Sequence, residues 1–203
     1  MTTNLLSQLT ENNPAPFTWL NGSRYTCLPG GGIRITAHPK SDFFRDPAGT
    51  MVADSAAYLH LAVTGDFVAQ ARVGHPFRTQ WDAAALMARI DPTHWAKICY
   101  EGTDFGTHAI VSVVTNGVSD DANGVNTHWP VVWLQLVRKG KTFGLQYGPD
   151  GMQWNMVRFF TLDAPATLQV GMVAQCPIGP GSEMDFLHFG VENVTVREAR
   201  NGL

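Results

Sequence analysis

A short stretch of the chain concentrates the residue types that could bind a polar ligand. Tryptophan rings can stack on the apolar face of a sugar, and charged side chains can form hydrogen bonds to its hydroxyl groups. Both kinds recur at alternate positions between residues 81 and 101, so they would share one face of a β-structure. The candidate binding residues are Trp81, Arg89, Trp95, Lys97 and Glu101, with Trp133 as an addition from a neighbouring strand.

Two strands joined by a tight turn must position these side chains. Residues 81–90 and 95–101 each alternate apolar residues with the candidate set, and the apolar members belong in the core. These apolar residues are Ala84, Leu86, Ala88, Ile90, Ala96, Ile98 and Tyr100. Because they must all lie on one face, few pairing registers remain.

The charges decide between the remaining registers. One register places Arg89 opposite Lys97, and like charges directly opposite each other are unfavourable. The other places Arg89 opposite Trp95 and Met87 opposite Lys97, and an arginine over a tryptophan ring gains about 0.5–1 kcal/mol. We therefore predict the second register, which also places Glu101 opposite a small residue.

This register would leave a groove on the outer face of the strand pair. Ala83, which faces Glu101, and Ala85 would form its floor, with Trp81 and Trp95 as its walls. The same face could instead be ordinary surface, which lysine and aromatic side chains often cover. It could also be the interface of a homodimer, which would use exposed tryptophans as well.

No other part of the sequence carries a complete catalytic or metal-binding motif. The seven histidines are scattered without a His-x-His pair, and there is no phosphate-binding loop or nucleophile elbow. We therefore expect no cofactor and no metal, and the catalytic residues stay unknown. The acidic stretch Ser119-Asp120-Asp121 could bind calcium weakly, but such a stretch is more commonly a solvated loop.

A second acidic pattern lies near the C-terminus. Glu183-Met184-Asp185 begins like the Glu-x-Asp-x-x-Glu strand of laminarinase-type glycoside hydrolases, whose retaining members hold two carboxylates about 5–5.5 Å apart. Here His188 replaces the second Glu, and the near-terminal position is wrong for those enzymes. We expect charges that protect a strand edge rather than an active site.

Composition limits the partners and the compartment. The 203 residues carry a net charge of −3 without a Lys/Arg cluster, which argues against nucleic acid and anionic membranes as partners. No apolar run is long enough to span a bilayer, and residues 1–13 lack the features of a secretory signal. The three cysteines are odd in number and far apart, which favours a reducing cytoplasm.

The strand pattern indicates an all-β fold. We predict about ten to twelve short strands in an antiparallel two-sheet sandwich, without a helix of three turns. Residues 1–203 should form a single domain, with residues 1–13 as a poorly patterned N-terminal extension. Residues 116–130 lack an apolar period and should be a long loop, and the aromatic loop between Pro39 and Gly49 should fold back on the sheet.

Motifs along nearly the whole chain resemble one family. They are GDF at 65–67, WDAAALMARIDPTHWAKICYE at 81–101, SVVTNGVSD at 112–120, VVWLQLVRKGKTF at 131–143, YGPDGMQW at 147–154 and VGMVAQCP at 170–177. The chain is similar to the regulation-of-enolase-type family of unknown function, which has a concanavalin A-like lectin/glucanase fold. The resemblance implies a jelly-roll sandwich of two curved sheets, with a concave face on which relatives of this superfold hold sugars.

The resemblance also singles out where this chain departs from its relatives. The family pattern runs Tyr-Asp-Gln-Ala-Gly-Leu-Met, followed by Trp-x-Lys and Glu. This chain keeps Trp95, Lys97 and Glu101 from that pattern. It has Ala83 in place of the Gln and Ala85 in place of the Gly, so the expected groove loses a polar group.

We therefore expect a non-catalytic protein that binds a carbohydrate or a similar small polar molecule on the concave face. The first alternative is a glycoside hydrolase or lyase, which would need a second carboxylate within about 9.5 Å of Glu101. The second alternative is a regulatory module of carbohydrate metabolism that contacts another protein. The fold alone does not decide among these functions.

Overall fold

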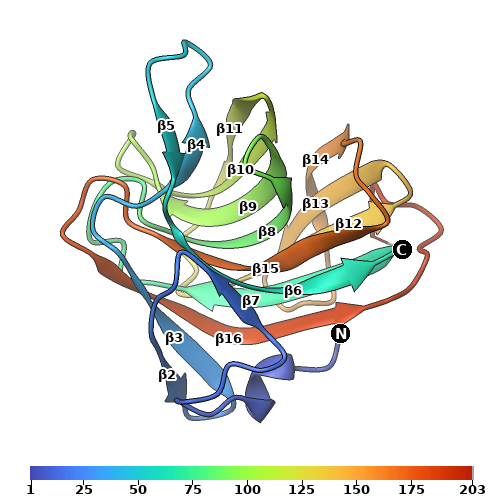
Figure 1. The fold of residues 1–203 in the computed structure, drawn as a ribbon, viewed down its shortest axis with the longest axis horizontal. Helices are drawn as coiled ribbons and strands as arrows, with labels where there is room; N and C mark the ends of the chain where they lie inside the picture. The colour runs from blue at the N-terminus through green and yellow to red at the C-terminus, as the bar shows by residue number, and fades with distance from the viewer. Residues whose placement is uncertain (203) are drawn as a thin grey trace.

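The computed structural model describes residues 1–202, which form a β-sandwich of two seven-stranded sheets and a separate hairpin (Figure 1). In spatial order, sheet I consists of β1 (Thr18–Leu20), β6 (Ala57–Thr64), β15 (Thr167–Gln175), β8 (Ala83–Asp91), β9 (His94–Gly102), β10 (His108–Asn116) and β11 (Val118–Asn126). Sheet II consists of β14 (Asn155–Thr161), β13 (Thr142–Gly148), β12 (Val132–Lys139), β7 (Phe67–Gly74), β16 (Ser182–Glu192), β3 (Gly32–Ala37) and β2 (Tyr25–Leu28). The hairpin is β4 (Phe43–Arg45) and β5 (Val52–Asp54). The predicted all-β, antiparallel two-sheet sandwich is confirmed.

The core lies between the two sheets because each central strand buries every second side chain there. On β8 and β9 the inward set includes Leu86, Ile98 and Tyr100, which are fully buried in the main apolar cluster. The predicted pairing of these strands is confirmed, with Arg89 opposite Trp95 and Met87 opposite Lys97. The alternate side chains of β8 and β9 therefore face the outer side of sheet I.

The β4–β5 hairpin covers part of this outer face (Figure 1). Ser41 pairs with Cys176 just beyond β15, which anchors the chain that enters the hairpin. Phe43 is fully buried, and its ring centroid lies 6.3 Å from that of Trp95 and 6.2 Å from that of Tyr58. The prediction that the aromatic loop folds back on the sheet is confirmed.

The prediction of a long loop over residues 116–130 is wrong. Residues 118–126 form β11, which pairs along its length with β10. Most β11 side chains are exposed at the edge of sheet I, so backbone pairing holds this strand without a hydrophobic pattern. Sixteen strands within residues 1–202 also exceed the predicted number, partly because three-residue strands such as β1 are too short to show alternation.

The N-terminal segment packs against the sandwich. Leu6 and Leu9 belong to the main apolar cluster, and Thr2 N donates to Gln70 Oε1 at 2.9 Å. Within residues 1–202, the only helical segment is a four-residue 3-10 turn, Leu5–Gln8. No helix in this part of the chain combines the length and the apolar character that crossing a bilayer requires.

Candidate binding pocket

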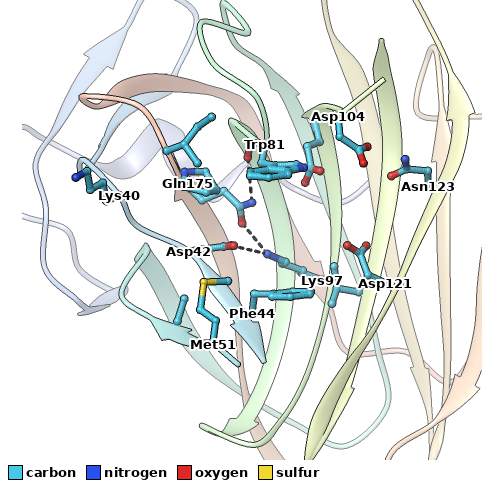
Figure 2. A pocket seen from close by; sticks show the side chains of 15 residues that line it. Lys40, Asp42, Phe44, Met51, Trp81, Lys97, Asp104, Asp121, Asn123 and Gln175 are labelled. Atoms are coloured by element: carbon cyan, nitrogen blue, oxygen red, sulfur yellow. Dashed lines mark hydrogen bonds and ion pairs between the residues drawn. The ribbon is translucent and has the colours of Figure 1, made fainter. Parts of the chain in front are cut away.

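A pocket of about 490 Å³ opens on the outer face of sheet I (Figure 2). Side chains of β9 and β10 form its floor, the β4–β5 hairpin lies on one side, and β11 lies on the other. Trp81, Lys97 and Glu101 line this pocket. The structure thus brings together three of the six side chains that the sequence suggested as ligand contacts, and their binding role stays a prediction.

Lys97 is buried in the floor, with 2% of its surface exposed. Its ammonium group donates to Asp42 Oδ1 at 3.1 Å, to Phe43 O at 2.8 Å and to Gln175 Oε1 at 2.7 Å. An ammonium group has three donors, so these bonds leave none for a ligand. Burial lowers the pKa of Lys97, but the combined attraction of Asp42, Cys99 and Glu101 outweighs that effect, so the pKa of Lys97 is raised. Lys97 therefore stays charged and ties the hairpin to sheet I.

Trp81 is held at the mouth of the pocket by its backbone. Its N–H donates to Gly102 O at 2.6 Å, and its carbonyl accepts from Gln175 Nε2 at 3.2 Å. Gln175 thereby connects Trp81 to Lys97, as the dashed lines in Figure 2 show. Trp81 has a φ of 66°, a conformation that bulky residues rarely adopt and that is concentrated at binding and catalytic sites. Its side chain remains 38% exposed.

Glu101 is the most unusual carboxylate of the pocket. It is 6% exposed, and no other residue of the range 1–202 forms a hydrogen bond with its side chain. Burial raises the pKa of Glu101 well above its usual value, Lys97 opposes this effect, and the carboxylates of Asp121 and Asp42 add to it. A nearly buried carboxylate that accepts no hydrogen bond from the protein gains little for stability, so its place in the pocket points to a role in binding.

An acidic wall stands beside Glu101. Figure 2 shows Asp104, Asn123 and Asp121 on the same side of the pocket. Asp121 of β11 pairs with Val113 of β10, which pairs with Lys97 of β9, so these residues share a row across the sheet. Desolvation and the carboxylate of Asp42 raise the pKa of Asp121, while Lys97 lowers it.

Two of the predicted contacts lie on the same face of sheet I but outside the pocket. Trp95 is 1% exposed beneath Phe43, so it cannot form the second wall of a groove. Arg89 is 7% exposed and lies 3.5 Å from Asp54 Oδ2, and it donates to Gln169 Oε1 at 3.3 Å. The periodicity correctly assigned both side chains to this face, but it could not show that the hairpin covers that end.

Trp133 does not come from a neighbouring strand. It belongs to β12 of sheet II, 8% exposed, with its ring centroid 4.9 Å from that of His188. The expectation that Trp133 joins the binding face is therefore wrong. Alternation along a strand gives the two faces of that strand but does not say which sheet the strand joins.

Sequence reasoning missed the residues that complete the pocket. Asp42 precedes β4, Gln175 ends β15, and Asp121 lies in the segment that was predicted to be a loop. Only long-range pairing brings them to β9, and no local motif marks that pairing. The one usable signal was the aromatic loop after Asp42, which was correctly predicted to fold onto the sheet.

The C-terminal acidic pattern lies on the other sheet. Asp185 of β16 forms a two-pronged ion pair with Arg34, with donor–acceptor distances of 2.6 and 2.9 Å, and Glu183 lies 3.9 Å from Arg78. These carboxylates have structural partners and are not among the pocket residues. Within residues 1–202, no group of three or more His, Cys, Asp or Glu residues is arranged to hold a metal ion.

The two antiparallel sheets define a concanavalin A-like, lectin/glucanase-type β-sandwich, with the pocket on an outer sheet face. The chain belongs to the family described as "Protein of unknown function (DUF1349)", which matches residues 19–194. The expected family resemblance is therefore confirmed.

Relatives support the same assignment. The chain is 29% identical over 170 residues to "Regulation of enolase protein 1" of Saccharomyces cerevisiae, covering 83% of this chain and 85% of the relative. A crystal structure of a functionally unknown protein from S. cerevisiae matches with a TM-score of 0.81 at 28% identity, over 89% of this chain and 97% of the other. Carbohydrate binding module CBM66 from Bacillus subtilis matches with a TM-score of 0.55 at 12% identity, over 87% and 94% of the two chains. This last likeness concerns the fold alone.

Proposed function

We propose that the protein is a non-catalytic binding protein whose pocket beside Trp81 holds a small polyhydroxyl ligand, in the first place a carbohydrate. The observation that carries the proposal is the exposed indole of Trp81, held in a strained backbone conformation at the edge of a polar pocket. A ring carried on a fixed backbone can stack on the apolar face of a sugar, and an indole has only two side-chain torsions to order on binding.

The polar groups of the pocket complement such a ligand. The carboxylates of Glu101, Asp104 and Asp121 are acceptors for hydroxyl donors, and the amide of Asn123 offers both donors and acceptors. The pocket volume of about 490 Å³ lies within the usual range of roughly 300–1,000 Å³ for small-molecule sites. The likeness to a carbohydrate binding module supports the proposal at the level of the fold.

The test is a binding measurement on two matched tryptophan variants. Trp81 and Trp129 are both 38% exposed, but Trp129 is not a pocket residue. Calorimetric titration with a panel of monosaccharides and disaccharides should detect binding to the wild type and to Trp129→Ala. Trp81→Ala should lose at least tenfold in affinity with its unfolding transition unchanged. Binding that is equal in both variants, or absent from the wild type across the panel, rejects the proposal.

Glycoside hydrolysis is a second candidate because of Glu101. Its carboxyl group has a raised pKa and shares the pocket with other carboxylates, and enzymes that cleave glycosidic bonds use such a proton donor beside an ionised carboxylate. The test is turnover of aryl glycosides by the wild type, by Glu101→Gln and by the control Glu183→Gln. Hydrolysis that only Glu101→Gln abolishes would support an enzyme, and a wild type without turnover would reject one.

We also propose that the protein works in the cytoplasm. Cys27, Cys99 and Cys176 are all free thiols, and the two buried ones are protected by packing rather than by disulfides. Localisation of a tagged full-length protein by fluorescence microscopy would test this proposal.

A further inference from the structure

We propose that the pocket selects ligands that carry a protonated amine, such as amino sugars, over their neutral and anionic counterparts. This inference rests on the proposed function, because it names the ligand class for the same pocket. Three independent features of the site lead to it: the balance of charge, an unpartnered buried carboxylate, and the position of the aromatic ring.

The first feature is the balance of charge. Four carboxylates line the pocket, and they belong to Asp42, Glu101, Asp104 and Asp121. The ammonium of Lys97 has all three of its donors engaged and is paired with Asp42. The second cation, Lys40, is exposed and lies across the pocket from Asp104 and Asp121 in Figure 2. Even when Glu101 is protonated, three aspartates, Asp42, Asp104 and Asp121, face two lysines, so the pocket keeps negative charge that its own cations do not neutralise.

The second feature is Glu101 itself. Its side chain is more than nine-tenths buried, lines the pocket and has no hydrogen-bond partner within the described part of the chain, residues 1–202. The carboxylate reaches solvent only through the pocket and accepts no hydrogen bond from the protein, so a donor on a bound ligand would meet an acceptor that is free to pair. A protonated amine offers up to three N–H donors and the opposite charge, and hydrogen bonds between charged groups are roughly twice as strong as neutral ones.

The third feature is the ring of Trp81. Tryptophan is the side chain whose face best attracts a cation, within about 6 Å of the ring centroid. Trp81 lines the same pocket as Glu101, and it is fixed at the backbone through Gly102 and Gln175. An amine held between a carboxylate and an indole face is recognised by both, whereas a phosphate or a carboxylate on the ligand would be repelled by the acidic wall.

The experiment compares matched sugars that differ in one group. The probes are D-glucosamine, D-galactosamine and D-mannosamine, their parent sugars, the N-acetylated amines and the 6-phosphates, measured by calorimetry at pH 7. We expect at least one amine to bind tenfold or more tightly than its parent sugar and its N-acetylated form. The corresponding 6-phosphate should bind more weakly than the parent sugar.

Charge variants test whether the preference for the amine comes from the pocket carboxylates or from the net charge of the protein. Glu101→Gln and Asp121→Asn should each reduce the preference for the amine to about threefold or less. Glu183→Gln removes the same charge from sheet II, outside the pocket, and should keep the preference. A wild type that binds amines and parent sugars equally would overturn this inference and leave the proposed function standing. A wild type that binds none of the probes would count against both.

Discussion

The ammonium of Lys97 lies 3.1 Å from the carboxylate of Asp42 and joins the centre of β9 to the chain that enters the β4–β5 hairpin. The pair does more than hold two segments together. The same ammonium donates a hydrogen bond to Gln175 Oε1. Gln175 Nε2 in turn donates to the carbonyl of Trp81 and holds this residue at the mouth of the pocket. One buried cation therefore positions the aromatic side of the candidate site.

Replacing Lys97 with Met should destabilise the fold strongly. The variant leaves Asp42 and the Phe43 carbonyl without their shared donor in a buried setting, and breaking such a pair costs about 3 kcal/mol or more. Urea denaturation would measure the loss. Lys141→Met is the matched control, because Lys141 pairs with Asp163 at the surface and should change stability by less than about 1 kcal/mol. Equal losses in the two variants would show that the buried pair is not structural.

Replacing Glu101 with Gln should stabilise the protein, and more so as the pH rises. The pKa of Glu101 is raised in the folded state, so the folded protein binds more protons than the unfolded chain between the usual glutamate pKa and the raised one. The wild type therefore loses stability as the pH rises through that interval, and a neutral amide does not. Thermal unfolding from pH 4 to pH 8 would measure the difference.

If the Glu101 carboxylate has a stabilising partner, the Gln variant will unfold at a lower temperature than the wild type at neutral pH. Glu183→Gln again serves as the control, since Glu183 is half-exposed and lies outside the pocket.

Replacing Phe43 with Ala should loosen the hairpin over Trp95. Phe43 is fully buried between the rings of Trp95 and Tyr58, and removing a buried phenylalanine ring costs about 3–5 kcal/mol. Phe105→Ala, in a side chain that is 77% exposed, should stay within about 0.5 kcal/mol of the wild type. Urea denaturation of both variants checks this, and a small effect at Phe43 would mean that the hairpin does not seal this end of the sheet.

Amine binding should release a proton and should strengthen as the pH rises through the raised pKa of Glu101. A bound cation favours the ionised carboxylate, so Glu101 gives up a proton that it held in the free protein. The charged or titratable groups around it are Lys97, Cys99, Asp42, Asp104 and Asp121. Calorimetry in two buffers of different ionisation enthalpy would detect the proton. Equal heats in both buffers would contradict the assignment of Glu101 as the amine's partner.

The β8–β9 pair shows what the sequence could determine. Alternation fixed the two faces, and repulsion between Arg89 and Lys97 was enough to select the observed register. The pocket could not be derived in this way, because Asp42 and Gln175 reach Lys97 from segments that are 55 and 78 residues away along the chain. β11 was not predicted from the sequence for a related reason. An exposed edge strand is held by backbone hydrogen bonds, which form with almost any side chain.

The tryptophans also show that a sequence pattern predicts the face of a side chain but not its exposure. The sequence placed Trp81 and Trp95 on one face, but a left-handed backbone exposes Trp81 and the hairpin buries Trp95. Neither fact has a local sequence signal. The candidate pocket was expected to have two aromatic walls, but only Trp81 lines it, and Asp104 and Asp121 line the side next to β11.

The most direct test of the account is fluorine NMR of the protein labelled with 5-fluorotryptophan. The tightest-binding sugar of the panel would be titrated in, and the Trp81 resonance would be assigned by its disappearance in Trp81→Phe. Our account predicts that the Trp81 signal shifts on binding while those of Trp95 and Trp133, which lie outside the pocket, do not. A shift at Trp95 or Trp133 with Trp81 unmoved would contradict it.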